Sequence, residues 1–565
     1  MQPSMLAKRL WSFLFLAVAA FYLYGLGAVP LVGPDEPRYA QVAREMLVRH
    51  DLITPTLSGL PWFEKPPLPY WMMMASYRVF GVSEFSARLG PAICGLLTAL
   101  FVYWIAAWGT SPNVREGSEH TQPSRNDLSR YSALAFLSSL GVIVFARAAS
   151  FDIVLTMTVT GAFACFFIWQ VRYRTRSGSD GIKANPPPAR INLLLLACYF
   201  FIGLSLLAKG LIGVVIPFGV IACYFLLRRE WPPRKFVVSL FWGAPLALAV
   251  AAVWYGPMIA RHGWTFIDQF IVQHHFARFL TNKYHHRQPF YYYVMTLAWL
   301  IFPWLIFFGS ALVSAREWRW RGAASIDRLR AFVLAWFLVP FIFFSLSESK
   351  LAAYILPVVP AAALMVGDRI THLLRARKGA LVIRLTSLLL LLTFVPGVWY
   401  AIRTFNIGFA CAIGIALVPI ISAAFALFAR RMPQTVFILF ALSTLGAAAV
   451  ALNCAAPLVV RGQSVRDLLS VARQRGYGTT PVVQLFAIQR TAEFYAAGRL
   501  TYRPDGEPKR LESVQEVADA ARRNGGEVLC LVPMEHEALL FQYQELQSEE
   551  LTNNGKVGLV VSRLR

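Results

Sequence analysis

Long apolar stretches alternate with short polar segments through the first 457 residues of the chain. Each stretch holds roughly 20 residues, the length that a helix needs to cross the hydrocarbon core of a bilayer. Backbone groups in lipid must be satisfied within the chain, so these stretches are predicted to be helices. We predict thirteen spans, with approximate limits 9–29, 85–108, 130–146, 150–170, 191–208, 210–227, 236–258, 290–313, 330–346, 350–368, 381–402, 405–428 and 434–457.

The C-terminal part, 458–565, has a different pattern. Charged residues become more frequent and the long apolar stretches stop. Helical and strand periodicities alternate there, which predicts a small α/β domain. The predicted helices are 464–473, 490–497 and 511–523, and the predicted strands are 481–486, 527–532 and 557–562. The expected fold is therefore mainly α, with a polytopic membrane domain at 1–457 and the α/β domain at 458–565.

Composition agrees with a membrane protein. The chain is 57% hydrophobic and only 15% charged, whereas a soluble domain carries about a quarter charged residues. The net charge of +24 would favour nucleic-acid binding in a soluble protein. Here Lys and Arg flank the predicted spans as topology signals, and no RNA- or DNA-binding motif is present. We therefore expect membrane lipids, and no nucleic acid, as partners.

Charge also predicts the orientation of the spans. The first apolar run follows Lys8 and Arg9, and we interpret it as an uncleaved span rather than a signal peptide. With the N-terminus inside, the predicted inner segments hold about twice as many Lys and Arg residues as the outer loops, as the positive-inside rule requires. Because thirteen is odd, the α/β domain is then expected outside the cytoplasm.

Two outer loops are predicted to be long, at 29–84 and 259–290. The first contains two expected helices on the membrane surface. One begins near Glu36-Pro37, with Pro at the first helical position, and the other follows Pro66-Pro67 with the amphipathic, aromatic character of interfacial segments. The second loop holds five of the nine histidines: His262, His274, His275, His285 and His286. Their spacing does not select zinc, so a divalent metal held by these histidines with Glu64 is kept only as a minor alternative.

The first loop begins with a polar cluster, Asp35, Glu36, Arg38 and Tyr39. One interpretation is that Asp35 or Glu36 caps a helix, whose first turn favours acids. The other is that the cluster orients a polar head group at the membrane surface. Further along, Lys65 follows Glu64 and precedes a Pro-stiffened helix start. A cation beside free helix N–H groups forms an anion site, although Lys65 can instead reach a lipid phosphate.

Further ionisable residues fall at span ends on the same predicted side. Asp152, with Arg147, stands at a turn into a span, so capping is an alternative to a functional role. Lys209 lies between two spans, and Lys350 and Tyr354 are four residues apart, which places them on one helix face. The remaining candidates on this side are Ser345, Glu348, Arg261, Arg278, Tyr284 and Arg287. A transporter places such charges near mid-membrane, so this one-sided cluster favours an active site over a transport path.

These motifs carry a family resemblance. Residues 34–47 read Pro-Asp-Glu-Pro-Arg-Tyr-Ala…Arg-Glu-Met-Leu, and Phe63-Glu64-Lys65-Pro66 follows. Both resemble the first-loop signatures of bacterial lipid A aminoarabinose transferases. Ala208-Lys209-Gly210 and Ser349-Lys350-Leu351, with Tyr354, resemble the wider family of polyprenyl-phosphate-dependent glycosyltransferases, which includes protein mannosyltransferases.

The resemblance implies a monomeric enzyme with the GT-C fold in the bacterial inner membrane, with its active site and C-terminal domain in the periplasm. The donor would be undecaprenyl phosphate carrying 4-amino-4-deoxy-L-arabinose, and the acceptor a lipid A phosphate, a modification that confers polymyxin resistance. Asp35 and Asp152 match the catalytic-site acids and Lys65 the donor-phosphate ligand, while Arg38 and Tyr39 match neighbours of that site. The expected donor-binding set also includes Glu64, Lys209, Lys350, Tyr354 and Arg278. The alternatives are a protein mannosyltransferase-type or other lipid glycosyltransferase and, more distantly, a transporter or an envelope scaffold.

Overall fold

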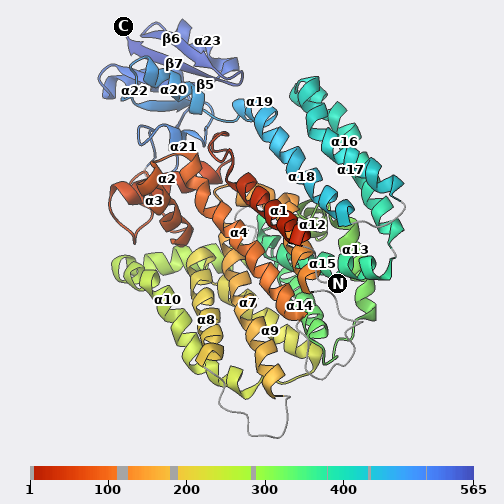
Figure 1. Ribbon diagram of the computed structural model, residues 1–565. Helices are drawn as coiled ribbons and strands as arrows, with labels where there is room; N and C mark the ends of the chain where they lie inside the picture. Colours follow the sequence, from red (N-terminus) through yellow and green to blue (C-terminus); the bar gives the residue numbers. More distant parts are fainter. Residues whose placement is uncertain are drawn as a thin grey trace. The chain divides into compact units, whose positions relative to one another are not determined.

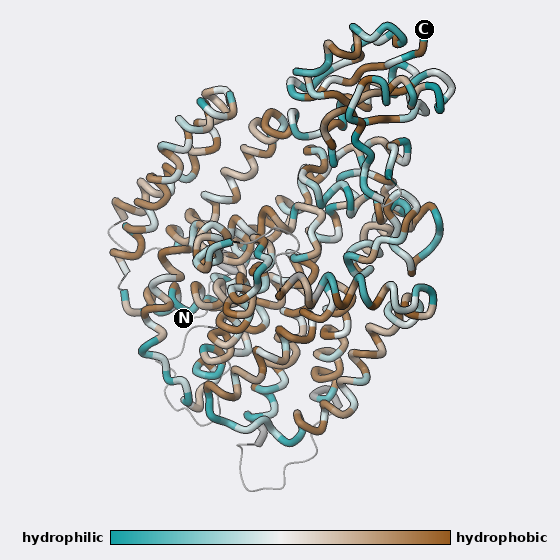
Figure 2. The backbone as a smooth tube through the Cα atoms, turned by 180° about the vertical axis from the view of Figure 1, so that it is seen from behind, coloured by the Kyte–Doolittle hydropathy of each residue, from teal (hydrophilic) through white to brown (hydrophobic). Residues whose placement is uncertain are grey.

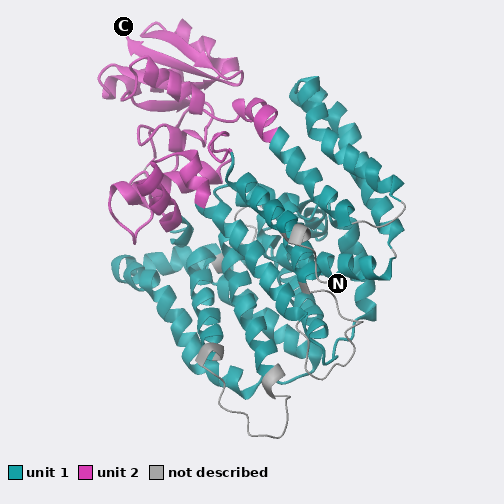
Figure 3. Cartoon of the chain, viewed as in Figure 1, with its two compact units in different colours: residues 1–24, 63–69, 90–450 teal, residues 25–62, 70–89, 451–565 magenta. Residues whose placement is uncertain are grey.

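The computed structural model describes residues 5–110, 125–177, 189–280, 288–377, 379–429, 434–503 and 506–565. The chain forms two compact units (Figure 3). Unit 1 comprises Met1–Tyr24, Phe63–Pro69 and Gly90–Val450, and unit 2 comprises Gly25–Trp62, Tyr70–Leu89 and Ala451–Arg565. Two segments of the first long loop therefore belong to the same unit as the C-terminal residues.

Unit 1 consists of helices (Figure 1). The first residues of α4 and the last residues of α18 extend into unit 2. The helices are α1 (Met5–Leu23), α4 (Glu84–Gly109), α5 (Arg125–Ser138), α6 (Leu140–Ala146), α7 (Phe151–Ser177), α8 (Ala189–Lys209), α9 (Ile212–Arg228), α10 (Arg234–Phe266), the π-helix η1 (Ile267–Ala277), α11 (Arg278–Leu280), α12 (Tyr292–Leu300), α13 (Leu305–Ser314), η2 (Ala315–Glu317), α14 (Ser325–Ser345), η3 (Ala352–Val358), α15 (Val359–Ala376), α16 (Ala380–Phe405), α17 (Phe409–Phe428) and α18 (Gln434–Cys454).

The described residues contain nine helices that are long and apolar enough to cross a membrane, or up to eleven if each of two bent pairs is one span. Shorter apolar helices cover Arg9–Leu23 and Ile212–Arg228. Every predicted span coincides with a helix or a bent pair, but the predicted number of thirteen is not confirmed. Hydrophobic residues run along these helices (Figure 2), and the chain is a multi-pass membrane protein.

One predicted span is broken at Ser139, where α5 and α6 meet at 62°. Ser139 has an extended backbone, with φ −68° and ψ 128°. The polar groups at the break find partners far along the chain: Leu140 N donates to the Phe302 carbonyl over 2.9 Å, and Thr444 Oγ1 donates to the Ser138 carbonyl over 2.6 Å. Such partners are what allow irregular backbone within a membrane domain.

The segment predicted as a second outer loop, 259–290, is helical over 259–280. Helix α10 continues to Phe266 with a kink at Gly263, whose φ of 53° and ψ of −134° suit glycine. The π-helix η1 follows directly. Phe266 stacks on Phe270 at a centroid distance of 5.3 Å, and Trp254 packs edge-on against Phe266 at 5.4 Å. Aromatic packing within this segment therefore sustains helix where the polar residues suggested a loop.

Unit 2 combines a small sheet domain with the helices of the first loop. Helices α2 and α3 confirm the two helices predicted there, although α2 begins at Asp35 rather than Glu36. Pro37 is then the third helical residue, a position where the missing N–H costs no intrahelical bond. The elements of unit 2 are α2 (Asp35–Val48), β1 (Thr56–Leu57), β2 (Leu60–Pro61), α3 (Leu68–Phe80), α19 (Ala456–Arg461), α20 (Arg466–Gln474), β3 (Val482–Leu485), α21 (Ala492–Tyr495), β4 (Arg510–Leu511), α22 (Val514–Arg523), β5 (Glu527–Pro533), η4 (Met534–His536), α23 (Ala538–Gln542), β6 (Leu546–Asn553) and β7 (Val557–Leu564).

The five-stranded sheet has the order β4-β3-β5-β7-β6. The pairs β3–β4 and β3–β5 are parallel, and β5–β7 and β6–β7 are antiparallel. One apolar cluster packs around Leu468 and Leu529, and a second packs around Val517 and Val528. The predicted helices and strands of this domain are confirmed to within a few residues, while β4, β6 and α23 were not predicted.

Candidate functional site

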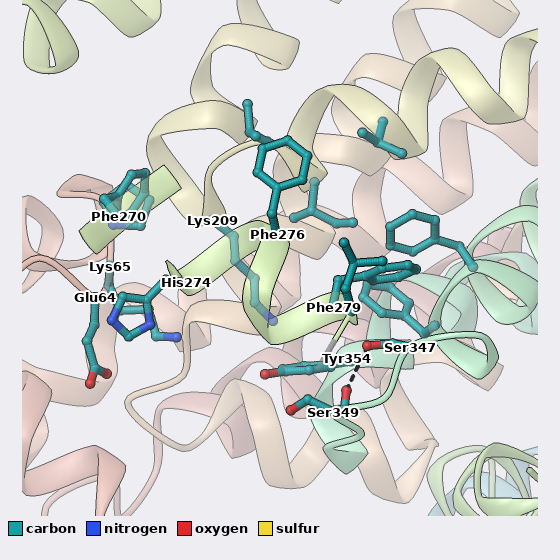
Figure 4. Close-up of a pocket in the computed structure, with 17 residues that line it drawn as sticks. Glu64, Lys65, Lys209, Phe270, His274, Phe276, Phe279, Ser347, Ser349 and Tyr354 are labelled. Carbon is teal, nitrogen blue, oxygen red and sulfur yellow. Dashed lines mark hydrogen bonds between the residues drawn. The ribbon is translucent and has the colours of Figure 1, made fainter. Parts of the chain in front are cut away.

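Unit 1 contains a cavity of about 530 Å³, within the size range of ligand pockets. It is formed by the segment before α3, the end of α8, the start of α9, η1, α11, the end of α14 and η3 (Figure 4). The lining residues are Glu64, Lys65, Pro66, Lys209, Leu211, Ile212, Val215, Phe270, His274, Phe276, Phe279, Leu280, Phe343, Phe344, Ser347, Ser349 and Tyr354.

The cavity is amphipathic. Five of its lining residues are phenylalanines, and four more are aliphatic: Leu211, Ile212, Val215 and Leu280. The charged and hydroxyl-bearing residues gather in the rest of the lining. In Figure 4, Glu64, Lys65 and His274 lie on one side of the view and Ser349 and Tyr354 on another, with Lys209 between them. A ligand with a long apolar part and a small anionic group matches this division.

Asp152 and Lys209 form an ion pair that joins α7 to α8. Asp152 is in the first turn of α7, where an acid interacts favourably with the helix dipole. Ser150, rather than Asp152, is the capping side chain here: its Oγ accepts a hydrogen bond from Asp152 N over 3.2 Å, and the Asp152 carboxylate pairs with Lys209. Lys209 ends α8 and is followed by Gly210 at φ 76°, a left-handed helix end that suits glycine. The side chains of the pair are 15% and 13% exposed, so this pair is largely withdrawn from solvent.

The Lys209 ammonium group also lies over the Tyr354 ring, 4.3 Å from its centroid (Figure 4). Tyr354 packs against Phe344 with a centroid distance of 5.7 Å. Tyr293 Oη donates to the Leu351 carbonyl over 3.2 Å, which fixes the turn before η3. Three of the predicted site residues, Asp152, Lys209 and Tyr354, are therefore brought together from segments far apart in the sequence.

Glu64 and Lys65 line the same cavity from the segment before α3. Their neighbour Phe63 is buried and packs edge-on against His262 at 4.9 Å and Phe266 at 5.6 Å. These ring contacts fix the backbone beside Lys65. Since Pro66 follows and α3 starts at Leu68, the Lys65 ammonium group and the first N–H groups of α3 belong to one short segment, as an anion site requires.

Lys350 does not share a helix face with Tyr354, so that prediction is wrong. Residue 350 precedes the 3-10 segment η3, which begins at Ala352. Lys350 is 93% buried, with a relative exposure of 7%, and it is not among the residues that line the cavity.

The structure describes only some of the candidate site residues that were predicted in the segment 259–290. Arg278 begins α11, but its side chain, like Tyr284, His285, His286 and Arg287, lies outside the described residues. Among the residues that the structure describes, no group of three or more His, Cys, Asp or Glu side chains is arranged to hold a metal ion. His274 lines the cavity, and His262 instead packs against Phe63.

Asp35, Arg38 and Tyr39 belong to unit 2, on α2. Asp35 is exposed in the first turn of the helix. Arg38 pairs with Glu493 of α21, Nε to Oε2 at 3.4 Å, and lies over the Trp62 ring at 4.9 Å. Tyr39 is buried. Arg38 thus connects the helix that carries Asp35 to the C-terminal domain.

Glu36 has a structural role that neither interpretation of the first-loop cluster included. It accepts two hydrogen bonds from Arg88, from Nε at 3.0 Å and from Nη2 at 2.8 Å. Arg88 also donates to the carbonyls of Leu26, Val29 and Pro30. Both side chains are buried, so this bidentate pair holds the segment that leads into α2.

Glu493 is the centre of the connection between α2 and α21. Its side chain is fully buried, and burial raises its pKa, although Arg38 and Arg490 act in the opposite direction. A carboxyl whose pKa is raised by folding stabilises the fold below its unfolded pKa, about 4.5, and loses that contribution as the pH rises through the folded value.

We therefore expect Glu493→Gln to gain stability relative to the unmodified protein between pH 4.5 and neutrality. Hydrogen exchange of the amides of 490–497 in the full-length protein measures this local stability. The exposed acid Glu535, 77% exposed, provides the control Glu535→Gln, which should show no such trend. If amide protection changed with pH in the same way in Glu493→Gln and in the unmodified protein, the assignment would be contradicted.

Sequence reasoning missed Glu493, Arg88 and all five phenylalanines of the cavity. Glu493 is 455 residues from its partner Arg38, and no local pattern indicates such a contact. Phe276 and Phe279 offered a weak signal, since they are three apart and share a helix face. That signal points to an apolar surface, without showing that the surface lines a cavity.

Comparison with known proteins supports the resemblance found in the sequence. Residues 9–114 match the model of the family described as dolichyl-phosphate-mannose-protein mannosyltransferase. The undecaprenyl phosphate-alpha-4-amino-4-deoxy-L-arabinose arabinosyl transferase of Edwardsiella ictaluri is 31% identical over 365 residues, which cover 63% of this chain and 59% of the relative. That of Yersinia enterocolitica is 31% identical over 356 residues, 62% of this chain and 57% of the relative. The matched residues thus span less than two thirds of these relatives.

Two solved structures share the fold over nearly the whole chain. The crystal structure of ArnT from Cupriavidus metallidurans bound to undecaprenyl phosphate has a TM-score of 0.75 and 22% identity, and covers 98% of both chains. The oligosaccharyltransferase of Archaeoglobus fulgidus is more distant, with a TM-score of 0.52 and 13% identity over 95% of this chain and 71% of that chain. This chain is therefore a multi-pass membrane protein with the ArnT-like GT-C fold and a relative of the bacterial undecaprenyl phosphate-aminoarabinose arabinosyl transferases.

Proposed function

We propose that this protein transfers 4-amino-4-deoxy-L-arabinose from undecaprenyl phosphate to a phosphate group of lipid A. The observation that carries the proposal is the amphipathic cavity of unit 1, which is lined by five phenylalanines and by the lysines Lys65 and Lys209. An undecaprenyl chain is long and apolar and ends in an anion. The relatives whose names state this donor, and the shared fold, support the same assignment.

In this proposal the bond between the sugar carbon and the lipid phosphate breaks as an acceptor phosphate oxygen attacks that carbon. Undecaprenyl phosphate leaves as an anion and needs no proton. Lys65 stabilises the charge that develops on the leaving phosphate, because fixed positive groups act most strongly in a site that excludes water. Lys209 is held beside the cavity by Asp152 and the Tyr354 ring, so its charge is oriented before the donor arrives.

The acceptor decides the role of the two acids. A protein hydroxyl must lose a proton when it attacks, so an acid would act as a general base. A lipid A phosphate is already an anion and needs no base. We therefore assign Asp35 and Asp152 to positioning, with Asp35 holding the cationic nitrogen of the aminosugar and Asp152 orienting Lys209.

For Asp35→Asn we expect donor binding to weaken by about tenfold or more, as when a hydrogen bond to a charged group is lost. Binding of undecaprenyl phosphate without the sugar should not change, because it lacks the cationic nitrogen. Equilibrium binding of both lipids to the purified protein measures this difference. Full transferase activity and unchanged donor binding in Asp35→Asn would remove Asp35 from the site.

A second candidate is sugar transfer to a protein hydroxyl, which the match to the protein mannosyltransferase family model favours. The two functions differ in their requirement for a general base. Transfer to a hydroxyl should fall as an essential carboxylate is protonated, whereas transfer to a phosphate has no such base.

We also propose the bacterial inner membrane as the location and a monomer as the active form. The N-terminus is placed in the cytoplasm, with unit 2 and the cavity on the periplasmic side. The distribution of Lys and Arg supports this orientation. Labelling of cysteines introduced into the C-terminal domain by a membrane-impermeant thiol reagent in intact spheroplasts tests the orientation.

The function is tested in a bacterium that lacks its own aminoarabinose transferase. The protein is expressed there, and mass spectra of lipid A are recorded. We expect lipid A to gain the mass of one aminosugar with the unmodified protein, and not with Lys65→Ala. An unchanged spectrum, with the protein shown to be in the membrane, would require a different sugar or acceptor.

A further inference from the structure

Unit 2 contains a second cavity, separate from the amphipathic cavity of unit 1. Its volume is about 230 Å³, and it is formed by α2, the start of α4, α20 and α21. Its charged and hydroxyl-bearing lining residues are Arg44, Arg466, Arg473, Glu84, Ser83, Ser470 and Tyr495. Three guanidinium groups face one carboxylate in this lining, so the cavity has an excess of positive charge.

Two of the arginines are held in place by the fold. Arg44 Nη1 donates to the Phe494 carbonyl over 2.8 Å, and its guanidinium lies over the Phe494 ring at 4.1 Å. Arg466 Nη1 lies 3.6 Å from Glu84 Oε1. Glu84 in turn accepts a hydrogen bond from Tyr495 Oη over 2.9 Å. Two of the three guanidinium groups are therefore fixed by the fold.

Arg473 adds a charge without a matching acid. It is exposed and, within the described part of the chain, forms no salt bridge. Burial lowers the pKa of Arg44, and the charge of Arg473 lowers it further, so the two guanidinium groups repel one another across the cavity. An anion between them would relieve that repulsion, and the forked geometry of arginine suits phosphate oxygens in particular.

The position of the cavity identifies the source of the anion. Glu84 is the first residue of α4, a helix long enough to span a membrane. A span that begins at Glu84 would bring this wall of the cavity to the level of the lipid head groups. The hydroxyl groups of Ser83 and Ser470 supply further donors for phosphate oxygens.

We infer that this arginine-lined cavity binds the phosphate group of a lipid head group at the membrane surface. The inference of an anionic lipid does not need the proposed function. The assignment of that lipid as lipid A, held by a phosphate while the sugar is transferred, rests on the proposed function. In that case the cavity is an acceptor-binding site, distinct from the donor cavity.

The test is native mass spectrometry of the full-length protein in detergent, without donor. The probes are bis-phosphorylated lipid A, lipid A with its phosphates removed, and phosphatidylglycerol. We expect Arg473→Ala to weaken binding of bis-phosphorylated lipid A by about tenfold, the effect of losing a hydrogen bond to a charged group. Arg473→Lys should retain part of the binding. Arg475→Ala removes an exposed arginine two residues away that does not line the cavity, and should change nothing.

The outcomes separate the two lipid sources. Arg473-dependent binding of lipid A alone identifies the acceptor, and equal effects on phosphatidylglycerol identify an ordinary phospholipid as the ligand. Binding that is the same for Arg473→Ala, Arg475→Ala and the dephosphorylated probe would overturn the inference. Because no sugar transfer is measured, an inactive protein would contradict the proposed function and leave this result standing.

Discussion

Replacing Lys65 with alanine is expected to lower the rate of sugar transfer by about 10²–10³-fold at saturating donor, the typical effect of removing one preorganised electrostatic group. Lys65 lines the amphipathic cavity from the segment that Phe63 anchors on α10. In the proposed reaction, its charge stabilises the leaving phosphate more strongly in the transition state than in the bound donor. The loss should therefore fall on kcat as well as on KM for the donor.

Two variants distinguish this role from a general effect of charge. Lys556, in the turn before β7, is an exposed lysine, so Lys556→Ala should leave the rate unchanged. Lys65→Arg retains the charge with a different shape and should keep more activity than Lys65→Ala. If Lys65→Ala raised KM for the donor and left kcat intact, Lys65 would bind the donor without acting in the transition state.

Replacing Asp152 with alanine is expected to destabilise the protein by about 3–5 kcal/mol, the usual cost of leaving one charge of a buried pair uncompensated. Lys209 is only 13% exposed, and its contact with the Tyr354 ring replaces little of the lost interaction. Thermal unfolding of the purified protein in detergent should show a clear fall in Tm. Transfer should be lost as well, because Lys209 is no longer oriented toward the cavity.

The chain offers a matched control for this pair. Arg510 and Glu512 form an ion pair in which both side chains are at least half exposed, so Glu512→Ala should cost no more than about 1 kcal/mol. The double exchange Asp152→Lys with Lys209→Asp should recover part of the stability, because the ion pair is restored. It should recover none of the transfer, because position 209, which lines the cavity, then carries a negative charge. Equal unfolding temperatures for Asp152→Ala and Glu512→Ala would show that the pair is not structurally important.

The membrane helices were predictable because their apolar runs are set by bilayer thickness. The points at which these helices are interrupted were not predictable. The break at Ser139 is stabilised by the carbonyl of Phe302 and the hydroxyl of Thr444, residues far along the chain. The helical segment after Gly263 was hidden for a similar reason, because its polar residues suggested a loop while the packing of Phe266 and Phe270 on Trp254 decided its structure.

The C-terminal domain shows the same limit. Strand β7 is apolar and buried along most of its length, and its prediction is confirmed. Strand β6, Leu546–Asn553, lies at the edge of the sheet, with polar residues at most positions. Edge strands are commonly polar, so the alternation that indicates a strand is absent there. Pairing with β7, rather than its own sequence, defines β6.

The types of residue at the candidate site followed from the sequence, but their grouping did not. Asp152 and Lys209 were placed in separate clusters, whereas the structure pairs them across 57 residues. Lys350 was grouped with Tyr354 on helical spacing, and the 3-10 turn separates them. Arg38 was associated with Asp35 as a neighbour, but its partner is Glu493. Tertiary contacts of this range leave no local signal in a single sequence.

The most direct test of the account is a cryo-EM structure of the protein in lipid nanodiscs with undecaprenyl phosphate. We predict density for the phosphate at hydrogen-bond distance, about 2.7–2.9 Å for a charged pair, from Lys65 Nζ. The lipid chain should follow the surface formed by Phe276, Phe279 and Phe343. Lipid density elsewhere in unit 1, with the amphipathic cavity left without the phosphate, would contradict the account.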